Sequence, residues 1–391
     1  MDLSNVKVAV VGVGFIGVAH VEALRRIGVD VACVVGSTAE RARAKVDAAG
    51  LPPAAESLAS VLADPTIDAV HIASPNHVHA DQVTACLDAG KHVICEKPLG
   101  ISSAQTAELV RRAEAAGVVN AVCFNLRFYA LNHQMAAMIA DGQIGRPTLI
   151  TGSYLQDWLL LDTDWNWRLD PAIGGQLRAL ADIGSHWLDL ARFVSGQTVS
   201  EVMADLHTTV PVRRRPPGPV ETFSSTSLDD ADLVDEPMST DDAATVLLRF
   251  ADGARGALTV SQVSAGHKNS LSLDIAGSKQ SLAWSSVTPD ELWIGHRGRP
   301  NERFFRDGSA MAPGAASITA YPPGHVEGYP DSFRALFAKI YLDIAGGAVS
   351  DRPDYPTFAD GHDVQLVIEA IAKSAETGSW QEVLRLDNEG P

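Results

Sequence analysis

Two side chains near the middle of the sequence have the types and spacing that proton transfer requires. Asp182 and His186 lie four residues apart in LADIGSHWLDLARFV, at the start of a tract whose apolar residues recur at helical spacing. Residues at this spacing share one face of a helix, which would place the carboxylate beside the imidazole. Histidine is well suited to accept and return a hydroxyl proton at neutral pH. Taken alone, the pair fits equally well a helix-capping aspartate and a surface histidine.

A third candidate is Lys97, in the stretch HVICEKPLG. The apolar residues before it predict a buried strand over 91–95, and charged residues are rarely fully buried without a partner. Loops at the carboxyl ends of parallel strands surround the crevice where ligands bind, which would place Lys97 there with Glu96 beside it. The alternative is a lysine that ends the strand in solvent. Pro98 stiffens the exit from the strand and favours the crevice.

A glycine-rich turn precedes these residues in VAVVGVGFIGVAH. Gly12, Gly14 and Gly17 have the GxGxxG spacing between a predicted strand and a predicted helix. The first glycine permits the tight turn, the second lets the backbone approach a pyrophosphate, and the third allows close helix packing. The start of the helix, at Phe15 and Ile16, would offer N–H groups to the phosphates. The turn therefore predicts a site for a dinucleotide, NAD or NADP.

The ribose end of this site is ambiguous. NAD sites commonly have an acidic residue at the end of the second strand, where this chain has Gly36 and Ser37 in VVGSTAER. Without that carboxylate a 2′-phosphate would not be repelled, and Arg41 could attract one. Arg41 could equally be a solvated helix residue. NAD, NADP and the use of both remain open from the sequence.

The loop after the third predicted strand reads ASPNHVHA. By the same topological rule, Ser74, Pro75, Asn76 and His79 lie beside the cofactor, with Asn76 as a helix cap and His79 as a cofactor contact. His77 and His79 could instead form a metal pair. The sequence offers no third ligand at a recognisable spacing, so we predict no metal site.

Alternating apolar strands and amphipathic helices build the first part of the chain, which indicates a parallel sheet with crossover helices. The predicted strands are 6–11, 29–35, 68–73, 91–95 and 119–123. From about residue 147 longer alternating strands follow one another, which favours an antiparallel or mixed sheet in an α+β domain. Its predicted strands are 148–156, 243–251, 255–264, 269–277, 279–286 and 290–295, and its helices lie near 182–195 and 356–377. Residues 208–242 lack periodicity and read as a mobile surface insertion, or else as a lid or oligomer contact.

The composition excludes several classes of protein. The chain of 391 residues is 46% hydrophobic and 20% charged, which is typical of a globular protein of two domains. Its net charge of −17 argues against nucleic acid as a partner. The four cysteines form no CxxC pair, which fits reduced thiols better than disulfides. No apolar span suits a membrane and no signal peptide is recognisable, so we expect a cytoplasmic protein.

Together these stretches resemble the glucose-fructose oxidoreductase, inositol dehydrogenase and rhizopine-catabolism (Gfo/Idh/MocA) family. GVGFIG with His20, SPNHVHA, CEKPLG, FNLRF, WNWRLD and DIGSHWLD stand in the order of that family. The resemblance implies an α/β Rossmann domain over 1–126, followed by an α+β domain over 127–391 with an open, mostly antiparallel sheet. That sheet often serves oligomer contacts, so a homodimer or homotetramer is expected.

The resemblance also assigns roles to individual residues. It implies that Lys97 is the lysine of the EKP motif and that Asp182 and His186 are the D-x-x-x-H pair. It implies that Trp167 and Arg168 approach the nicotinamide side and that Asn125 and Arg127 line the cleft. Trp167, Arg168 and Asn125 are therefore predicted cofactor contacts, as is Glu96 beside Lys97, and Arg127 is a predicted substrate contact. Aromatic and amide side chains suited to sugars complete the predicted substrate site: Tyr154, Gln156, Asp157, Trp158, Trp165, Asn166 and, from a late loop, His325.

The sequence therefore predicts an NAD(P)-dependent oxidoreductase that moves hydride to or from a secondary hydroxyl carbon of a sugar, glycoside or cyclitol. His186 would be the general base, Asp182 would orient it, and Lys97 would stabilise the alkoxide. A redox-assisted glycosidase, which oxidises C3 transiently, eliminates the aglycone, adds water and is reduced again, is the alternative. A cofactor sensor without catalysis agrees less well with the presence of all three residues.

Overall fold

The computed structural model of the chain describes residues 3–218, 233–347 and 349–385. They form two compact units, one built from residues up to 125 together with 329–365, the other from 126–328 and the residues from 366 onward. The segment 329–365, which the sequence analysis placed in the second domain, packs within the first unit because helix α10 (Tyr329–Gly346) lies against α1 (Phe15–Arg26). The chain therefore passes between the two units three times.

The first unit is an alternating α/β structure, as the sequence predicts. Besides α1 and α10 its elements are β1 (Lys7–Val11), β2 (Asp30–Val35), α2 (Ala39–Ala49), α3 (Leu58–Leu62), β3 (Ala69–Ile72), the 3₁₀ turn η1 (Asn76–Val78), α4 (His79–Asp88), β4 (His92–Cys95), α5 (Ser103–Ala116) and β5 (Asn120–Val122).

Its five strands pair in parallel in the order β2-β1-β3-β4-β5. The chain reverses its direction of travel across the sheet between β1 and β3, which are neighbours, so a crevice is expected beyond their carboxyl ends. The strands are nearly continuous apolar runs, and all four residues of β3 are buried, because a parallel sheet is covered on both faces. The loops after β1, β3 and β4 are the ones that carry the predicted cofactor residues.

The second unit is built mainly from strands. Its elements are the 3₁₀ turn η2 (Asn125–Phe128), α6 (Ala130–Ala140), β6 (Pro147–Leu155), η3 (Trp167–Leu169), α7 (Pro171–Gly174), the π-helical turn η4 (Leu180–Gly184), α8 (Ser185–Ser195), β7 (Val199–His207), β8 (Val212–Arg215), β9 (Val234–Pro237), β10 (Ala243–Phe250), β11 (Arg255–Ser261), β12 (Ser270–Gly277), β13 (Gln280–Ser285), β14 (Glu291–His296), β15 (Glu302–Phe305), α9 (Pro313–Ala316) and β16 (Gln381–Glu382). Helix α11 (Phe358–Thr377) begins in the first unit and ends in the second.

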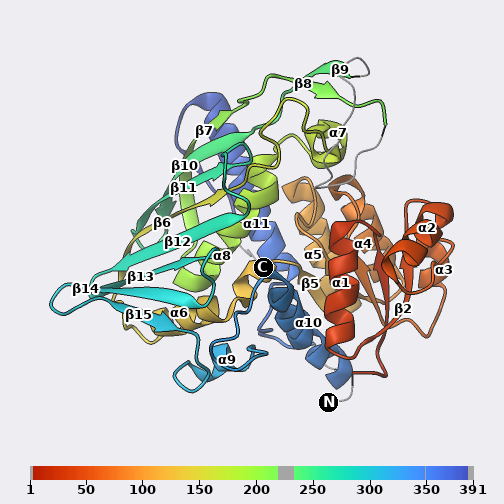
Figure 1. The fold of residues 1–391 in the computed structure, drawn as a ribbon, viewed down its shortest axis with the longest axis horizontal. Coiled ribbons are helices and arrows are strands. Elements are labelled where there is room, and N and C mark those ends of the chain that lie inside the picture. The colour runs from red at the N-terminus through yellow and green to blue at the C-terminus, as the bar shows by residue number, and fades with distance from the viewer. Residues whose placement is uncertain (1–2, 219–232, 348, 386–391) are drawn as a thin grey trace, which may run out of the picture. The chain divides into compact units, whose positions relative to one another are not determined.

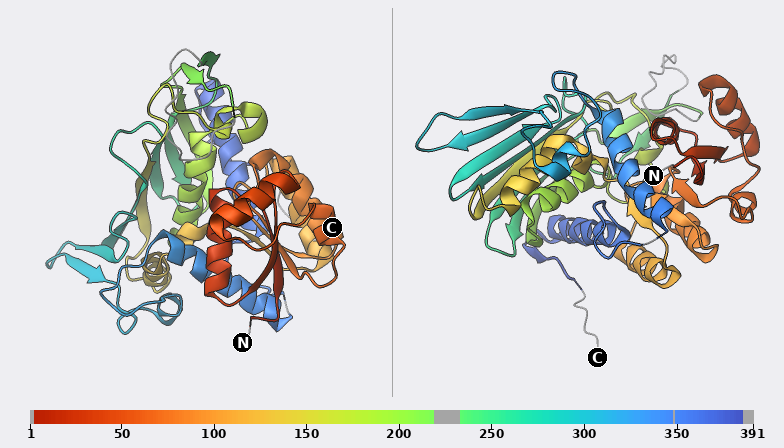
Figure 2. Two further views of the ribbon diagram at one scale, coloured as in Figure 1. Left: turned by 45° about the vertical axis from the view of Figure 1, so that its right-hand side comes forward. Right: turned by 90° about the horizontal axis from the view of Figure 1, so that it is seen from below.

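Nine of these strands form one sheet in the order β15-β14-β13-β12-β6-β11-β10-β7-β16, in which only the β6–β11 pair is parallel. Helix α8 packs on β6 and β12, and α6 packs on α8 and β13, so both cover the same face of the sheet (Figures 1 and 2). The opposite face exposes Leu149, Leu247 and Trp293. The predicted mostly antiparallel sheet is confirmed. The register of the strands places these three exposed side chains on the same face of the sheet.

Several elements were not predicted from the sequence. Strand β7 was not predicted, because a bulge opposite Phe250 interrupts the alternation of buried and exposed residues along it. Helix α6 is buried over most of its surface, which removes the amphipathic pattern. Helix α10 follows a segment rich in proline and glycine that reads as a loop.

The described parts of the 208–242 insertion are regular rather than irregular. Strands β8 and β9 pair antiparallel, with Arg213 fully buried. The interpretation as a lid or oligomer contact concerns residues that lie partly outside the described range.

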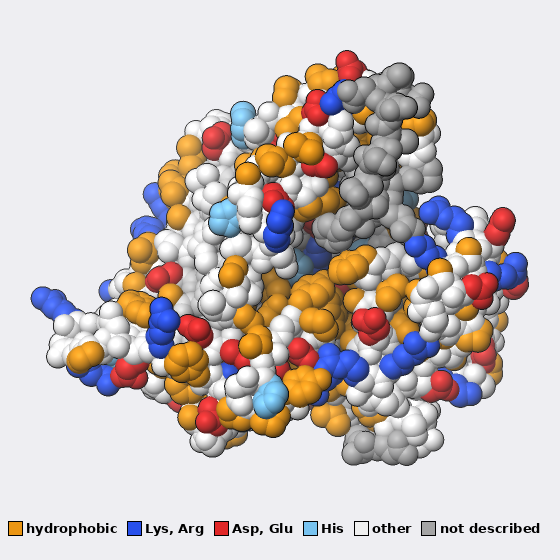
Figure 3. All heavy atoms as spheres, viewed as in Figure 1, with side chains coloured by type: hydrophobic (Ala, Val, Ile, Leu, Met, Phe, Trp, Pro, Cys, Tyr) orange, Lys and Arg blue, Asp and Glu red, His pale blue; other side chains and the backbone are white. Residues whose placement is uncertain are grey.

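Acidic and basic side chains are interspersed over the face that Figure 3 shows. Among the residues that the structure describes, no helix is both long and apolar enough to cross a membrane.

Candidate active site

The glycine turn between β1 and α1 has two closed positions and one open position. Gly12 has a φ of +112°, and a Cβ on it would lie 2.3 Å from the Ala73 carbonyl oxygen. A Cβ on Gly17 would lie 1.9 Å from the Gly12 carbonyl oxygen, so helix and turn touch there. At Gly14, by contrast, no heavy atom of the described residues lies within 4 Å of the Cβ position. Two glycines therefore close the turn and the third leaves open space at the N-terminus of α1, where Phe15 and Ile16 begin the helix.

The predicted ribose residues follow β2 on an exposed surface. Ser37 is exposed, and Thr38 caps α2 by accepting a hydrogen bond from the backbone N–H of Arg41 (3.2 Å). The Arg41 side chain is itself exposed. This geometry is compatible with a 2′-hydroxyl and with a 2′-phosphate.

The loop after β3 is held by its own polar side chains. Ser74 donates a hydrogen bond to Gln82 (2.6 Å). The expectation that Asn76 caps a helix is wrong, because Pro75 is the N-cap of η1 and Asn76 is already inside the turn. The Asn76 side chain is therefore one residue beyond the N-cap position.

His79 ties this loop to the loop after β4. Its Nδ1 lies 2.7 Å from the Pro98 carbonyl oxygen and its Nε2 lies 2.8 Å from that of Ser74. The ring is buried, and burial lowers its pKa, opposed by the hydrogen bonds to both carbonyls. Because both nitrogens face backbone oxygens, His79 joins two loops instead of offering a nitrogen to a cofactor. His77, by contrast, is exposed.

The loop that carries Lys97 is anchored through its neighbour. Glu96 is buried, accepts from the Lys97 backbone N–H (3.1 Å) and lies 3.1 Å from His20 Nε2. His20 contacts His71 (2.9 Å between Nδ1 atoms), whose Nε2 lies 2.8 Å from the Tyr341 hydroxyl. Lys97 is half-buried, and the peptide bond to Pro98 is cis. Glu96 thus belongs to a buried chain of polar groups that the sequence analysis did not predict, since its members are far apart in sequence.

Two members of this buried group of polar side chains, together with Cys123, are possible metal ligands. A nitrogen of His20, an oxygen of Glu96 and the sulfur of Cys123 lie within 4.8 Å of one another. Burial raises the pKa of the Cys123 thiol, and a protonated thiol is a poor ligand. His20 and Glu96 also bond to each other. The group is better explained as the support of Lys97.

Asn125 is buried at the end of the first unit, and its Nδ2 donates to the Ser332 hydroxyl (2.8 Å), which holds the start of α10. Its contact with the cofactor stays a prediction.

In the second unit, Asp182 and His186 lie on either side of a change in helix type. Asp182 is in the π-helical turn η4, and His186 is in the first turn of α8, where it is buried. The sequence predicts a single α-helix, so the extra residue of the π turn is a difference from expectation. Such turns are often found at functional sites. His186 packs beside Tyr154, with 6.3 Å between ring centroids.

Side chains from two other segments contact the Asp182 carboxylate. Arg168 Nε lies 3.3 Å from Oδ1, and Gln262 Nε2 donates to Oδ2 at 2.8 Å. Arg168 also stacks over the Trp167 ring at 4.3 Å and contacts Asn166. Asp182 is therefore a held carboxylate and not a helix cap, which removes the alternative interpretation. Gln262 was not predicted; it carries no recognisable motif.

Some of the predicted substrate residues form one cluster of amide, indole and phenol groups. Tyr154 and Gln156 are buried and both donate to Asn269 Oδ1, at 2.7 and 2.9 Å. Trp158 Nε1 donates to Gln156 Oε1 (2.9 Å), which also accepts from Gln262 (3.2 Å). Burial raises the pKa of Tyr154, so its phenol stays neutral and can donate.

Asp157, Arg127 and His325 are among the predicted residues that lie outside this cluster. Asp157 pairs with Lys268 (2.7 Å), whose hydrogen bond lowers the pKa of the carboxyl. Arg127 is buried in an ion pair with Asp189, one turn beyond His186, and so supports α8. His325 is exposed on a loop whose backbone is held by Arg306. These positions follow from partners that the sequence does not reveal.

The three arginines of β8 all contact the segment that connects β6 to η3, residues 157–165, called here the 157–165 loop. Arg213 donates to backbone carbonyls of this loop, Arg214 pairs with Asp162 (3.1 Å), and Arg215 lies 5.4 Å from the Trp165 ring centroid. The insertion therefore has a defined attachment beside the predicted substrate residues.

Comparison with known proteins covers nearly the whole chain. Residues 6–124 match the model of an oxidoreductase family with an NAD-binding Rossmann fold, and residues 132–283 match the model of the GFO/IDH/MocA C-terminal domain. Levoglucosan dehydrogenase of Pseudarthrobacter phenanthrenivorans is 30% identical over 97% of this chain and 99% of that protein. Myo-inositol 2-dehydrogenase of Thermotoga maritima is 27% identical over 76% of this chain and 82% of that protein.

Solved structures agree with these matches. Levoglucosan dehydrogenase in complex with NADH and levoglucosan superposes with a TM-score of 0.86 at 28% identity, covering 98% of this chain and all of that one. An inositol dehydrogenase homologue from Azotobacter vinelandii in complex with NAD⁺ gives a TM-score of 0.84 at 25% identity, covering 96% of this chain and 97% of that one.

Proposed function

Because the chain belongs to the Gfo/Idh/MocA family of oxidoreductases, we propose that it moves hydride between a nicotinamide cofactor and a secondary hydroxyl carbon of a sugar, glycoside or cyclitol. The names of its relatives support this class, since levoglucosan is an anhydro sugar and inositol a cyclitol. One observation carries the proposal: the Asp182 carboxylate is held inside a cluster of amide and phenol groups of the kind that binds hydroxyls.

The chemistry divides between the cofactor and the protein. The bound nicotinamide supplies the hydride acceptor or donor. His186 takes the proton of the substrate hydroxyl as general base, while Asp182 orients the imidazole. Lys97 donates a hydrogen bond to the oxygen on which negative charge develops, and so stabilises the alkoxide. Loss of the proton from the hydroxyl oxygen and of the hydride from the carbon that bears it leaves a ketone.

The glycine turn fits a dinucleotide, because its open position is at Gly14 and its closed positions are backbone contacts. The residues that would hold the phosphates are Gly12, Gly14 and Phe15, with Ser37 and Arg41 near the ribose. Ser37 carries no negative charge that would repel a 2′-phosphate. We therefore propose NAD⁺ and NADP⁺ as equal candidates for the cofactor. We also expect a homodimer or homotetramer formed through the open face of the sheet.

The test is turnover by the purified protein with levoglucosan, myo-inositol, xylose and glucose, each with NAD⁺ and with NADP⁺. We expect reduced cofactor to accumulate in step with substrate consumed. His186→Ala should lower kcat by about 10²- to 10⁴-fold, since that is what general base catalysis contributes. His207→Ala, which removes an exposed histidine on β7, is the matched control.

Two results would contradict the proposal. Wild-type kcat in His186→Ala would remove the base from the mechanism. Cleavage of a glycoside with only a trace of cofactor, and with no net reduction of it, would replace the dehydrogenase by the redox-assisted glycosidase.

A further inference from the structure

The side chain of Gln262, the residue after β11, is fully buried and makes three hydrogen bonds. Its Nε2 donates to Asp182 Oδ2 (2.8 Å) and to Gln156 Oε1 (3.2 Å), and its Oε1 accepts from Arg178 Nη1 (2.6 Å). A guanidinium only donates and a carboxylate only accepts, so these two partners fix which way the amide faces. The N–H groups of Gln262 therefore point at Asp182 and its carbonyl oxygen points away.

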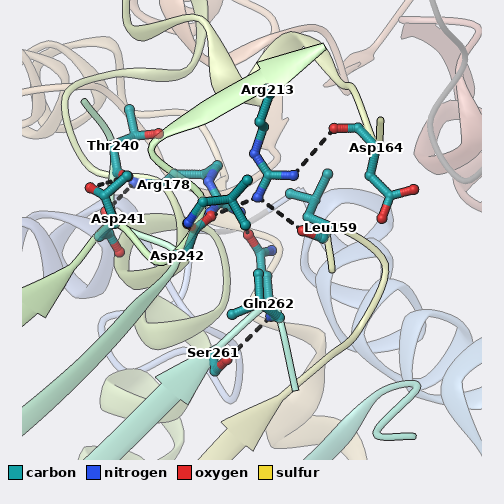
Figure 4. A network of polar contacts seen from close by, with 12 residues as sticks. Leu159, Asp164, Arg178, Arg213, Thr240, Asp241, Asp242, Ser261 and Gln262 are labelled. Carbon is teal, nitrogen blue, oxygen red and sulfur yellow. Dashed lines mark hydrogen bonds and ion pairs between the residues drawn. The ribbon is translucent and has the colours of Figure 1, made fainter. Parts of the chain in front are cut away.

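A cluster of buried charges stands behind Gln262. Arg178 and Arg213, both without exposed side-chain surface, pair with the same carboxylate oxygen of Asp242, in the second case at 2.8 Å (Figure 4). Asp241 accepts from the backbone N–H groups of Arg178 (2.6 Å) and Leu180 (2.8 Å). Two guanidinium groups and two carboxylates balance, and buried charges need such pairing. The cluster fixes Arg178 at both its backbone and its side chain, just before the π turn that carries Asp182.

The same cluster reaches the 157–165 loop. Arg213 donates to the carbonyl oxygens of Leu159 and Leu161, each at 2.9 Å, and lies 3.4 Å from that of Asp164 (Figure 4). The backbone of Gln262 bonds to both sides as well, donating to the Asp242 carbonyl oxygen (3.0 Å) and accepting from the Leu159 N–H (3.2 Å). Insertion, loop and π turn therefore meet at one residue, the first two at the backbone of Gln262 and the π turn at its side chain.

We propose that Gln262 is a positioning residue for the Asp182 carboxylate, and that the cluster of Arg178, Asp242 and Arg213 acts through it. Arg178 holds the Gln262 amide in one orientation, and the amide holds Asp182 and Gln156 at a fixed separation. The inference rests on the proposed function, because it concerns the carboxylate assigned to orient the base. It adds a residue and a physical cause. The Gln262 amide is oriented by Arg178, and Arg178 is held by the Asp242 carboxylate that it shares with Arg213.

Gln262→Glu tests the inference most sharply. It replaces the N–H group that faces Asp182 by a carboxylate oxygen, and two carboxylates in contact share a proton, so the pKa of the pair rises. The other groups that face Asp182 are Arg168 in its ion pair, Arg178 and Tyr154 at longer range, and His186 one turn along the helix. All are unchanged in the variant. We expect the acid limb of the pH profile of kcat/KM to move up by about 1 pH unit or more.

The matched control is Gln197→Glu. Gln197 is also buried and also donates its Nε2 to a carboxylate, that of Asp252 at 3.0 Å, after α8 and away from the substrate cluster. Both variants should melt closer to the wild type at pH 5.5 than at pH 8, because the folded state of each takes up a proton as the pH falls. Only Gln262→Glu should change the pH profile of kcat/KM. A second variant, Gln262→Leu, should lower kcat/KM about ten- to hundredfold, the effect of losing a hydrogen bond to a charged group.

The outcomes separate the two proposals. If the wild type turns over and Gln262→Glu keeps its pH profile, the positioning role is wrong and the proposed function stands. If no carbohydrate is turned over, the proposed function fails, and the melting of Gln262→Glu at the two pH values still reports whether Gln262 faces Asp182.

Discussion

The two units hold their predicted functional groups by different means. In the first, the cofactor residues lie on short loops fixed by backbone contacts, such as the approach of Gly17 to the Gly12 carbonyl oxygen and of His79 to two carbonyl oxygens. In the second, Asp182 is held by the side chains of Arg168 and Gln262. Behind Gln262, two buried arginines pair with Asp242. At Gly12 and Gly17 the turn tolerates no added atom, while the ion-pair cluster tolerates no lost charge. The two units should therefore fail under opposite kinds of substitution.

The largest effect is expected in the second unit. Arg213→Met keeps the length of the side chain but leaves the buried Asp242 carboxylate with one guanidinium partner instead of two, and removes the donor to three loop carbonyl oxygens. This should cost about 3–5 kcal/mol of the free energy of unfolding. Arg214→Met removes an exposed pair with Asp162 and should cost at most about 1 kcal/mol. Urea unfolding of both variants measures the difference. Equal losses would mean that burial of the Arg213 cluster does not govern the stability of this unit.

In the first unit the corresponding change adds an atom. Gly17→Ala places a methyl group 1.9 Å from a backbone oxygen and should cost about 1–3 kcal/mol of stability. Gly14→Ala enters open space with an ordinary φ of −78°, so its stability should hardly change. It should nevertheless weaken cofactor binding, because the methyl group occupies the approach to the phosphates. The measurement is the shift in melting temperature on addition of NAD⁺ or NADP⁺; an undiminished shift in Gly14→Ala would place the phosphates elsewhere.

The smallest effect concerns His71, a buried histidine of the first unit. Burial, followed by the neighbouring His20, lowers the pKa of His71 well below its usual value. The unfolded chain takes up a proton at this position as the pH falls below about 6.5, while the folded chain does not, so stability is lost as the pH falls. His71→Gln removes that titration, and its stability should fall by about 1 kcal/mol less than that of the wild type between pH 6.5 and 5.5. Parallel pH dependences of the two proteins in urea unfolding would show that His71 is not held neutral.

The same contrast explains what the sequence could reveal. Gly12, Gly14 and Gly17 are close together in the sequence, and their GxGxxG spacing directly predicts the turn between strand and helix. The five strands of the first sheet and six of the nine strands of the second were predictable, because burial on one or both faces imposes a period on the residues. His79 was placed near the right loops but given the wrong partner, since its two carbonyl oxygens are backbone atoms with no sequence signature.

The support of Asp182 was not predictable by these means. Gln262 is 80 residues from Asp182, and Arg178 is 64 residues from Asp242. Arg213 stands in a run of three arginines among prolines, which reads as a solvated stretch although its first member is fully buried. A glutamine at a buried position of a strand is the one signal that could have indicated Gln262, because a buried amide must find partners.

The return of residues 329–365 to the first unit has a consequence for synthesis of the chain. Tyr341, the hydroxyl partner of His71, follows it by 270 residues, and Phe358 donates its N–H to Asn120 across 238 residues. A ribosome adding about 5–20 residues per second needs on the order of tens of seconds to cover that distance. During this interval the nascent nucleotide-binding half lacks α10, and His20 and His71 lack the aromatic rings of Phe333 and Phe337 that enclose them. The half that begins first is thus completed only after nearly all of the other has been made.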